Sequence, residues 1–150
     1  MINQAISRQF IAITLLLCIG KTNITSAAEI IASPRSPTSF ISLNDTRQIF
    51  FMRIHEWPDG TPINVYVLED HNEVHKAFSK EKLGVFPYKL RRLWDRHIFS
   101  GTGQAPVVVN TESEMIKIIS SSQGSIGYAN KSSIDEAKKG GFNVQIINIK

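Results

Sequence analysis

The segment INVYVLEDHNEVHKAFSKEKLG, residues 63–84, changes its periodicity partway along. Its first seven residues alternate and are rich in β-branched side chains, which predicts a strand over residues 63–69. The remainder opens with two candidate helix N-caps, Asp70 and Asn72, and closes on a glycine, so it predicts a helix over residues 70–84. A strand followed directly by a helix is the repeating unit of an α/β fold.

The same alternation of strands and helices continues on both sides of this segment. The Ser42 hydroxyl can cap the N–H of Asp45, which predicts a short helix after it, and the apolar spacing from Pro87 to Phe99 predicts a longer one. The other predicted elements are strands at 29–33, 106–110, 124–130 and 142–150 and helices at 112–122 and 132–141. We expect the 106–110 strand to be buried and residues 33–40 to be an extended connector. The pattern predicts one α/β domain whose helices cover a mostly parallel or mixed sheet.

The first 28 residues have the layout of a secretory signal peptide. Arg8 precedes an uninterrupted apolar run over residues 10–20, and small residues follow at positions 26–28. The run is too short to span a bilayer, which disfavours an uncleaved anchor. We therefore expect cleavage near Ala28, a mature domain over residues 29–150, and a periplasmic or secreted location.

The single cysteine, Cys18, lies inside this leader. Lipoprotein processing needs a small residue before the cysteine, and Leu17 stands there, so a lipid anchor is not expected. After cleavage the domain has no disulfide and no cysteine metal ligand. The leader holds two of the 17 basic residues and none of the 13 acidic ones, so the formal charge falls from +4 to +2. A domain this close to neutral is not expected to bind nucleic acid.

The stretch Ser100-Gly101-Thr102-Gly103 has the composition of a phosphate-binding loop. Such a loop works at the start of a helix, where N–H groups and the positive end of the dipole face the anion. This stretch instead follows the end of a predicted helix, where the dipole is negative and glycine is a common cap, so we favour a capping role. An anion site on Ser100, Gly101 and Thr102 is the alternative, because the preceding helix carries four basic residues: Lys89, Arg91, Arg92 and Arg96.

Five short motifs occur in order between residues 41 and 130. They are SLNDTRQIF, WPDGT, an aromatic helix around Trp94, FSGTGQAP and GSIGYA. In this order and with these gaps, the chain resembles small proteins related to the substrate-binding component of phosphate ABC transporters. The resemblance implies the type 2 periplasmic-binding-protein fold, in which full-length members clamp the ligand between two α/β lobes. It implies that this chain is a single such lobe, a mixed sheet flanked by helices, in an extracytoplasmic setting.

The same resemblance implies where a ligand would bind. In full-length phosphate binders, the ligand loop of this lobe is an Arg followed by Ser-Gly-Thr, between a strand and the next helix. The corresponding junction here, residues 68–73, has neither feature and carries three carboxylates. Carboxylates near a phosphate dianion oppose its binding, which argues against the family's known phosphate mode. Asp70, His71 and Asn72 are the candidate ligand contacts at this junction, with the ligand left open.

Two imidazoles four residues apart, His71 and His75, have a spacing that can hold a divalent metal. Without a third ligand we favour two surface histidines and predict no metal site. His97 is expected to be structural, because it shares an amphipathic face with Trp94 and Ile98. No cofactor is predicted, since the glycine pair of GSIGYA is too weak a signal for a nucleotide site.

No catalytic set stands out in the sequence. There is no Ser-His-Asp order, no pair of catalytic carboxylates and no complete metal set, so we do not expect an enzyme. The favoured hypothesis is an exported, non-enzymatic, solute-binding-like module. Its ligand would be a small anion or another solute, and its partner an ABC permease or a membrane sensor. The alternative is a single-lobe protein-interaction or sensor accessory protein, whose exposed cleft face docks another protein or a second copy in a homodimer.

Overall fold

The computed structural model describes residues 27–101 and 104–150. The predicted signal peptide, apart from its last two residues, and Thr102 lie outside the described residues. The strands are β1 (Glu29–Ala32), β2 (Phe40–Ile41), β3 (Asn64–Leu68), β4 (Val107–Val109), β5 (Ser125–Ala129) and β6 (Gln145–Ile149). The helices are α2 (Leu43–Phe50), α3 (Glu73–Glu81), α4 (Pro87–Phe99), α5 (Glu112–Ser121) and α6 (Lys131–Lys139). No described helix has the length and apolar character that a membrane span requires.

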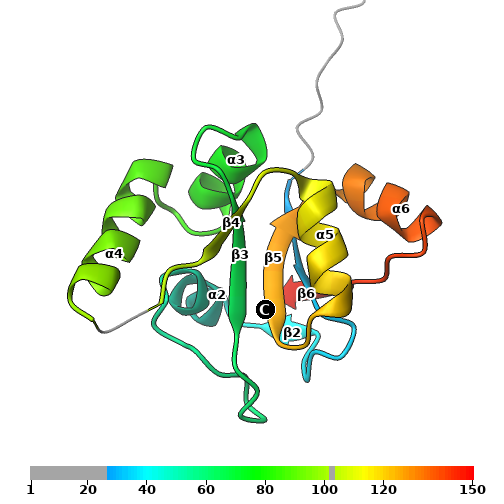
Figure 1. The fold of residues 1–150 in the computed structure, drawn as a ribbon, viewed down its shortest axis with the longest axis horizontal. Coiled ribbons are helices and arrows are strands. Elements are labelled where there is room, and N and C mark those ends of the chain that lie inside the picture. The colour runs from blue at the N-terminus through cyan, green and yellow to red at the C-terminus, as the bar shows by residue number, and fades with distance from the viewer. Residues whose placement is uncertain (1–26, 102–103) are drawn as a thin grey trace, which may run out of the picture.

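The strands form one mixed sheet in the order β2-β6-β1-β5-β3-β4. β1 runs antiparallel to both of its neighbours, and the other pairs are parallel. Helices cover both faces (Figure 1), with α2, α3 and α4 on one side and α5, flanked by α6, on the other. The predicted α/β class, a mixed sheet flanked by helices, is therefore confirmed.

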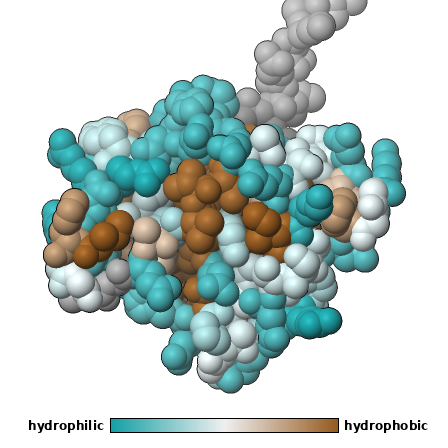
Figure 2. Space-filling view, in the orientation of Figure 1, coloured by the Kyte–Doolittle hydropathy of each residue, from teal (hydrophilic) through white to brown (hydrophobic). Residues whose placement is uncertain are grey.

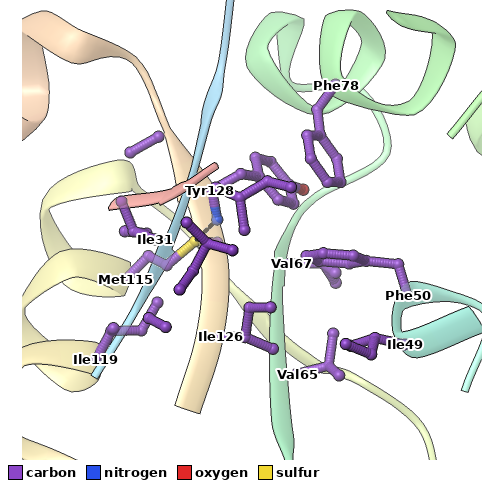
Figure 3. Close-up of a cluster of buried hydrophobic side chains, with 14 of the residues drawn as sticks. Ile31, Ile49, Phe50, Val65, Val67, Phe78, Met115, Ile119, Ile126 and Tyr128 are labelled. Carbon is purple, nitrogen blue, oxygen red and sulfur yellow. Dashed lines mark hydrogen bonds between the residues drawn. The ribbon is translucent and has the colours of Figure 1, made fainter. Parts of the chain in front are cut away.

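Alternate residues of β5 face these two helical layers. Tyr128 and Ile126 point toward α2 and α3, where Tyr128 stacks on Phe78 with ring centroids 3.9 Å apart (Figure 3). Gly127 points toward α5, and a Cβ there would lie 2.6 Å from the Met115 sulfur. A glycine is thus needed at this position because α5 packs directly against the backbone of β5.

The structure confirms the predicted helix caps at Ser42 and Thr111, but one helix starts later than predicted. The Ser42 hydroxyl accepts from the N–H of Asp45 at 2.9 Å, and the Thr111 hydroxyl accepts from Glu114 at 3.1 Å. Asn72 caps α3, so that helix begins three residues later than the predicted start at Asp70. These side chains satisfy backbone donors that the first helical turn leaves without partners.

Two predictions about strands are wrong. The strand predicted as buried is β4, which lies at the edge of the sheet, and its Val107 and Val108 side chains are 50% and 42% exposed. The region predicted as a connector, residues 33–40, contains Phe40, the first residue of β2, which pairs in parallel with β6. Both errors concern sheet edges, whose position depends on strand order and not on local sequence.

The prediction for the outer part of α4 is also wrong in part. Trp94 is buried as expected and donates from its indole nitrogen to the carbonyl of Phe50 at 2.9 Å. Ile98, however, is 44% exposed, because the buried face of this helix runs through Leu90 and Trp94 and ends before the last turn. His97 is half-buried, and its Nε2 has no hydrogen-bond partner among the described residues.

Candidate functional site

The junction between β3 and α3 is organised around a carboxylate–guanidinium pair. Arg91 of α4 donates to Asp70 through two nitrogens, Nε at 3.2 Å and Nη2 at 2.8 Å. The pair forms because α3 and α4 pack side by side, which brings together residues 21 positions apart. The hydrogen bond to Asp70 raises the pKa of the Arg91 guanidinium. Two parallel bonds are the arrangement in which Arg binds an external carboxylate or phosphate, so Asp70 takes the place of such a ligand.

The other two predicted contacts at this junction, His71 and Asn72, differ in whether their side chains are free to contact a solute. The Asn72 side-chain oxygen accepts from the N–H of Val74 at 2.9 Å and is therefore engaged as a helix cap. The His71 side chain is 82% exposed, and its Nε2 lies 3.2 Å from a carboxylate oxygen of Glu69. His71 is thus the predicted contact whose side chain can turn toward a solute at little energetic cost.

A buried chain of hydrogen bonds lies beneath Asp70. The N–H of Leu68 donates to the Tyr128 hydroxyl at 2.9 Å, and that hydroxyl bonds Nδ1 of His75. The hydroxyl accepts from Leu68 and still has its own proton to donate, and Nδ1 of His75 is the acceptor at hydrogen-bonding distance, so we assign Tyr128 as the donor and Nδ1 as the acceptor. The imidazole proton consequently sits on Nε2, which faces the Ser79 hydroxyl at 3.4 Å and an Asp70 oxygen at 3.8 Å.

The side chains of Leu68, Tyr128 and His75 are fully buried, and this burial determines the protonation states of Tyr128 and His75. Desolvation lowers the pKa of His75 from 6.5 to about 4, against the opposing effect of Asp70, so the imidazole is neutral at neutral pH. Desolvation also raises the pKa of Tyr128 above its ordinary value. The prediction that His75 is a surface residue is therefore wrong, since its side chain is 0% exposed.

This arrangement also separates the two histidines that were considered as a metal pair. The His75 ring points into the core toward Tyr128, and the His71 side chain is in solvent. Among residues 27–101 and 104–150, no group of three or more His, Cys, Asp or Glu side chains is placed to hold a metal ion.

At the N-termini of α5 and α6, the helices that follow β4 and β5, side-chain carboxylates of the protein accept hydrogen bonds from backbone N–H groups. Glu112 accepts from the N–H of Asn130, which precedes α6, and Glu114 accepts from the N–H of Asn110 at 3.0 Å. Helix N-termini attract anions because their N–H groups lack partners and the dipole is positive there. Here internal carboxylates occupy those positions, so these donors are already used.

The predicted capping role of Ser100 and Gly101 is confirmed. Both backbone N–H groups donate to carbonyls of the last turn of α4, at 3.0 Å each, and Gly101 has a φ of +69°. Gly101 lines a groove with Asn64, at the amino end of β3, whereas Asp70 lies beyond the carboxyl end. The predicted ligand residues that the structure describes therefore fall into two groups at opposite ends of one strand and do not form a single site.

A shallow basin adjoins Asp70 and was not predicted. It has a volume of about 320 Å³ and is lined by Asp70, Lys76, Lys80, Phe86, Pro87 and Tyr88. The rings of Phe86 and Tyr88 stack with centroids 5.9 Å apart, and the Lys80 ammonium lies 5.3 Å from the Phe86 ring. Both rings are about half exposed, so the basin offers an aromatic surface beside charged groups.

A larger groove of about 560 Å³ lies between β2, the start of α2 and the Trp57–Pro58 turn. Its walls are mainly apolar, and Asp45, Glu56 and Lys150 supply the charges. None of the predicted ligand residues that the structure describes lines it. No sequence signal could have found it, because its walls come from segments more than 100 positions apart in the chain.

Comparisons with solved structures agree with the fold implied by the sequence motifs. PstS from Borrelia burgdorferi superposes with a TM-score of 0.63 at 19% identity, over 83% of this chain and 47% of that chain. An ABC-type phosphate transport receptor from Vibrio cholerae gives 0.62 at 16% identity, over 83% and 46%. A putative phosphate ABC transporter substrate-binding protein with bound phosphate from Clostridium perfringens gives 0.61 at 18%, over 83% and 45%.

Sequence comparisons do not add to this structural similarity. No protein-family model and no curated protein matches the chain. The chain spans just under half the length of the binding proteins that it matches. It has the fold of a periplasmic-binding-protein lobe, similar to the corresponding half of phosphate ABC transporter substrate-binding proteins.

Proposed function

We propose that the protein is an exported, non-enzymatic, solute-binding-like module whose ligand contacts lie at the β3–α3 junction. The helices that follow β3 and β4, α3 and α5, cover opposite faces of the sheet, so the carboxyl ends of these two strands form a topological switch point. In α/β folds, ligands bind at such a switch point. The observation that carries the proposal is the partly exposed Asp70–Arg91 pair beyond the carboxyl end of β3, with the basin beside it.

The chemistry of the junction favours a ligand other than a phosphate dianion. Arg91 is already paired, and the nearby carboxylates of Glu69 and Glu73 would repel a dianion. The pair can instead accept and donate hydrogen bonds with a zwitterionic or neutral solute. Phe86 and Tyr88 would stack on a planar or apolar part of that solute. Asp70, His71 and Asn72 are the contacts we propose, with Ser100, Gly101 and Thr102 as a separate second group.

Calorimetry on residues 29–150 tests this function. The titrants are phosphate, sulfate, zinc chloride and a zwitterionic aromatic solute, free tryptophan. We expect saturable binding of tryptophan that weakens in Asp70→Asn and in Tyr88→Ala. Phe40→Ala is the matched control, because Phe40 is an equally exposed aromatic in the other groove. Tight binding of phosphate or zinc, or equal loss in Phe40→Ala, would contradict the proposal.

One observation favours a second function, that of a protein-interaction or sensor accessory module that forms a homodimer. Figure 2 shows an apolar band over β4 and β3 in the middle of the face, and Val107 and Val108 contribute exposed side chains to β4. An edge strand can pair with the same strand of a second copy across a two-fold axis. Light scattering should then show a dimer that Val107→Thr/Val108→Thr converts to a monomer. An ABC permease or a membrane sensor would be the downstream partner of either function.

A further inference from the structure

The outer face of α4 carries a stripe of two aromatic and two basic side chains. Tyr88, Arg92, Arg96 and Phe99 are spaced by four, four and three residues, which places them on one side of the helix. Tyr88 is 55% exposed and Phe99 is 88% exposed. We call these four residues the α4 stripe. Apolar side chains are visible among hydrophilic ones over α4 in Figure 2.

The two arginines of the stripe have no carboxylate partner in the part of the chain that the structure describes. Arg92 lies over the Tyr88 ring, with its guanidinium carbon 5.9 Å from the centroid, and Arg96 forms no ion pair with another described residue. Arg91, the neighbour of Arg92 in sequence, is by contrast paired with Asp70. Two like charges four residues apart on a helix weaken it, so the fold gains nothing from this pair.

Positive charge is concentrated in this part of the molecule. Residues 70–99, which contain α3 and α4, hold seven basic and four acidic residues. The rest of residues 29–150 holds eight basic and nine acidic residues. The net formal charge of residues 70–99 is therefore +3, and that of the rest of residues 29–150 is −1. Such an uneven distribution steers an acidic partner toward one face of a nearly neutral protein.

We propose that the α4 stripe docks a protein partner that presents carboxylates next to an apolar side chain. Tyr, Phe and Arg are the residues enriched at the centres of protein interfaces, and the flat Arg guanidinium binds a carboxylate through two bonds. A helix that lies on a membrane needs a broad apolar face toward the lipid. The apolar face of α4, with Leu90 and Trp94, is buried in the core, which leaves only the two ends of the stripe apolar. This inference does not depend on solute binding at Asp70.

A peptide probe tests the proposal on residues 29–150. The probe is a fluorescent synthetic peptide of alternating Glu and Leu residues, and its binding is followed by anisotropy at low and high salt. We expect the double variant Arg92→Glu/Arg96→Glu to weaken binding by about tenfold or more, and Tyr88→Ser/Phe99→Ser to do so as well. The control is Lys138→Glu/Lys139→Glu, which makes the same charge change at the end of another helix, α6. We expect this control to bind within about twofold of the wild type.

Several results would overturn the proposal. One is equal weakening in the α6 control, which would mean that net charge alone drives binding. Another is failure of the probe to bind wild-type protein whose circular dichroism shows it to be folded. Binding to vesicles of phosphatidylglycerol in place of the peptide would assign the stripe to a membrane. Light scattering that shows a dimer lost in Tyr88→Ser/Phe99→Ser would assign it to a second copy.

Discussion

Acidification from pH 7 to pH 5 should destabilise the native state by about 2 kcal/mol through His75 alone. The buried imidazole has a pKa of about 4 in the folded protein, against 6.5 for an exposed histidine. The unfolded chain therefore takes up the proton first, and stability falls with pH. The contribution is complete above about pH 6.5 and is lost as pH falls through 4. At 1.36 kcal/mol per pKa unit, the full loss is about 3 kcal/mol.

Urea denaturation of residues 29–150 at pH 7, 6 and 5 measures this loss. The informative variant is His75→Asn, whose side-chain oxygen can accept the Tyr128 proton but does not titrate in this range. We expect it to be less stable at pH 7 and to lose about 2 kcal/mol less than wild type between pH 7 and pH 5. Subtracting the two curves removes the contribution of the carboxylates.

His71→Asn is the matched control, because it removes a histidine four positions away whose side chain is in solvent. It should keep the wild-type loss between pH 7 and pH 5. This role of His75 is refuted if His75→Asn retains the full pH dependence, since the imidazole would then be protonated alike in both states. Loss of the pH dependence in His71→Asn would refute it equally.

Three further variants test the packing and the junction. Gly127→Ala should lower the free energy of unfolding by about 1–3 kcal/mol, because its Cβ would lie 2.6 Å from Met115 Sδ and 2.8 Å from Ile119 Cδ1; unchanged urea denaturation would mean that α5 yields freely. Trp94→Phe removes the hydrogen-bond donor to the buried Phe50 carbonyl and should lower the free energy of unfolding by about 1–3 kcal/mol in the same assay. An unaltered urea midpoint would contradict the importance of that bond. Asp70→Ala should lower the free energy of unfolding by less than about 1 kcal/mol, because the side chains of Asp70 and Arg91 are both more than a third exposed. The freed Arg91 should bind sulfate, so that sulfate raises the melting temperature of this variant but not that of the wild type. Absence of that rise would show that Asp70 does not block an anion.

Local sequence predicted the parts of the fold that depend on neighbouring residues. The caps at Ser42 and Thr111 each join residues three positions apart, so the residue types and their spacing suffice to predict them. Edge strands depend on distant partners. β2 pairs with a strand more than 100 residues away, and β4 is apolar yet exposed because no strand lies beyond it. Neither fact has a local signal.

The sequence predicted a candidate site at the β3–α3 junction but gave no indication of the partners of its side chains. The cap residues and carboxylates around Asp70 marked the β3–α3 junction. The partner of Asp70 lies 21 positions away on another helix, and the partner of His75 lies 53 positions away on β5. A histidine near a helix start in a polar segment gives no sign that its side chain is buried. Only the packing of α3 against the middle of the sheet, where Phe78 and His75 meet Tyr128 of β5, buries it.

Asp70 occupies the position on Arg91 where a free oxyanion would bind. Calorimetric titration of monomeric residues 29–150 with inorganic phosphate at neutral pH tests this most directly. We predict no saturable heat for the wild type, and a measurable, weak signal once Asp70→Ala frees Arg91. Tight, saturable phosphate binding by the wild-type monomer would contradict the account.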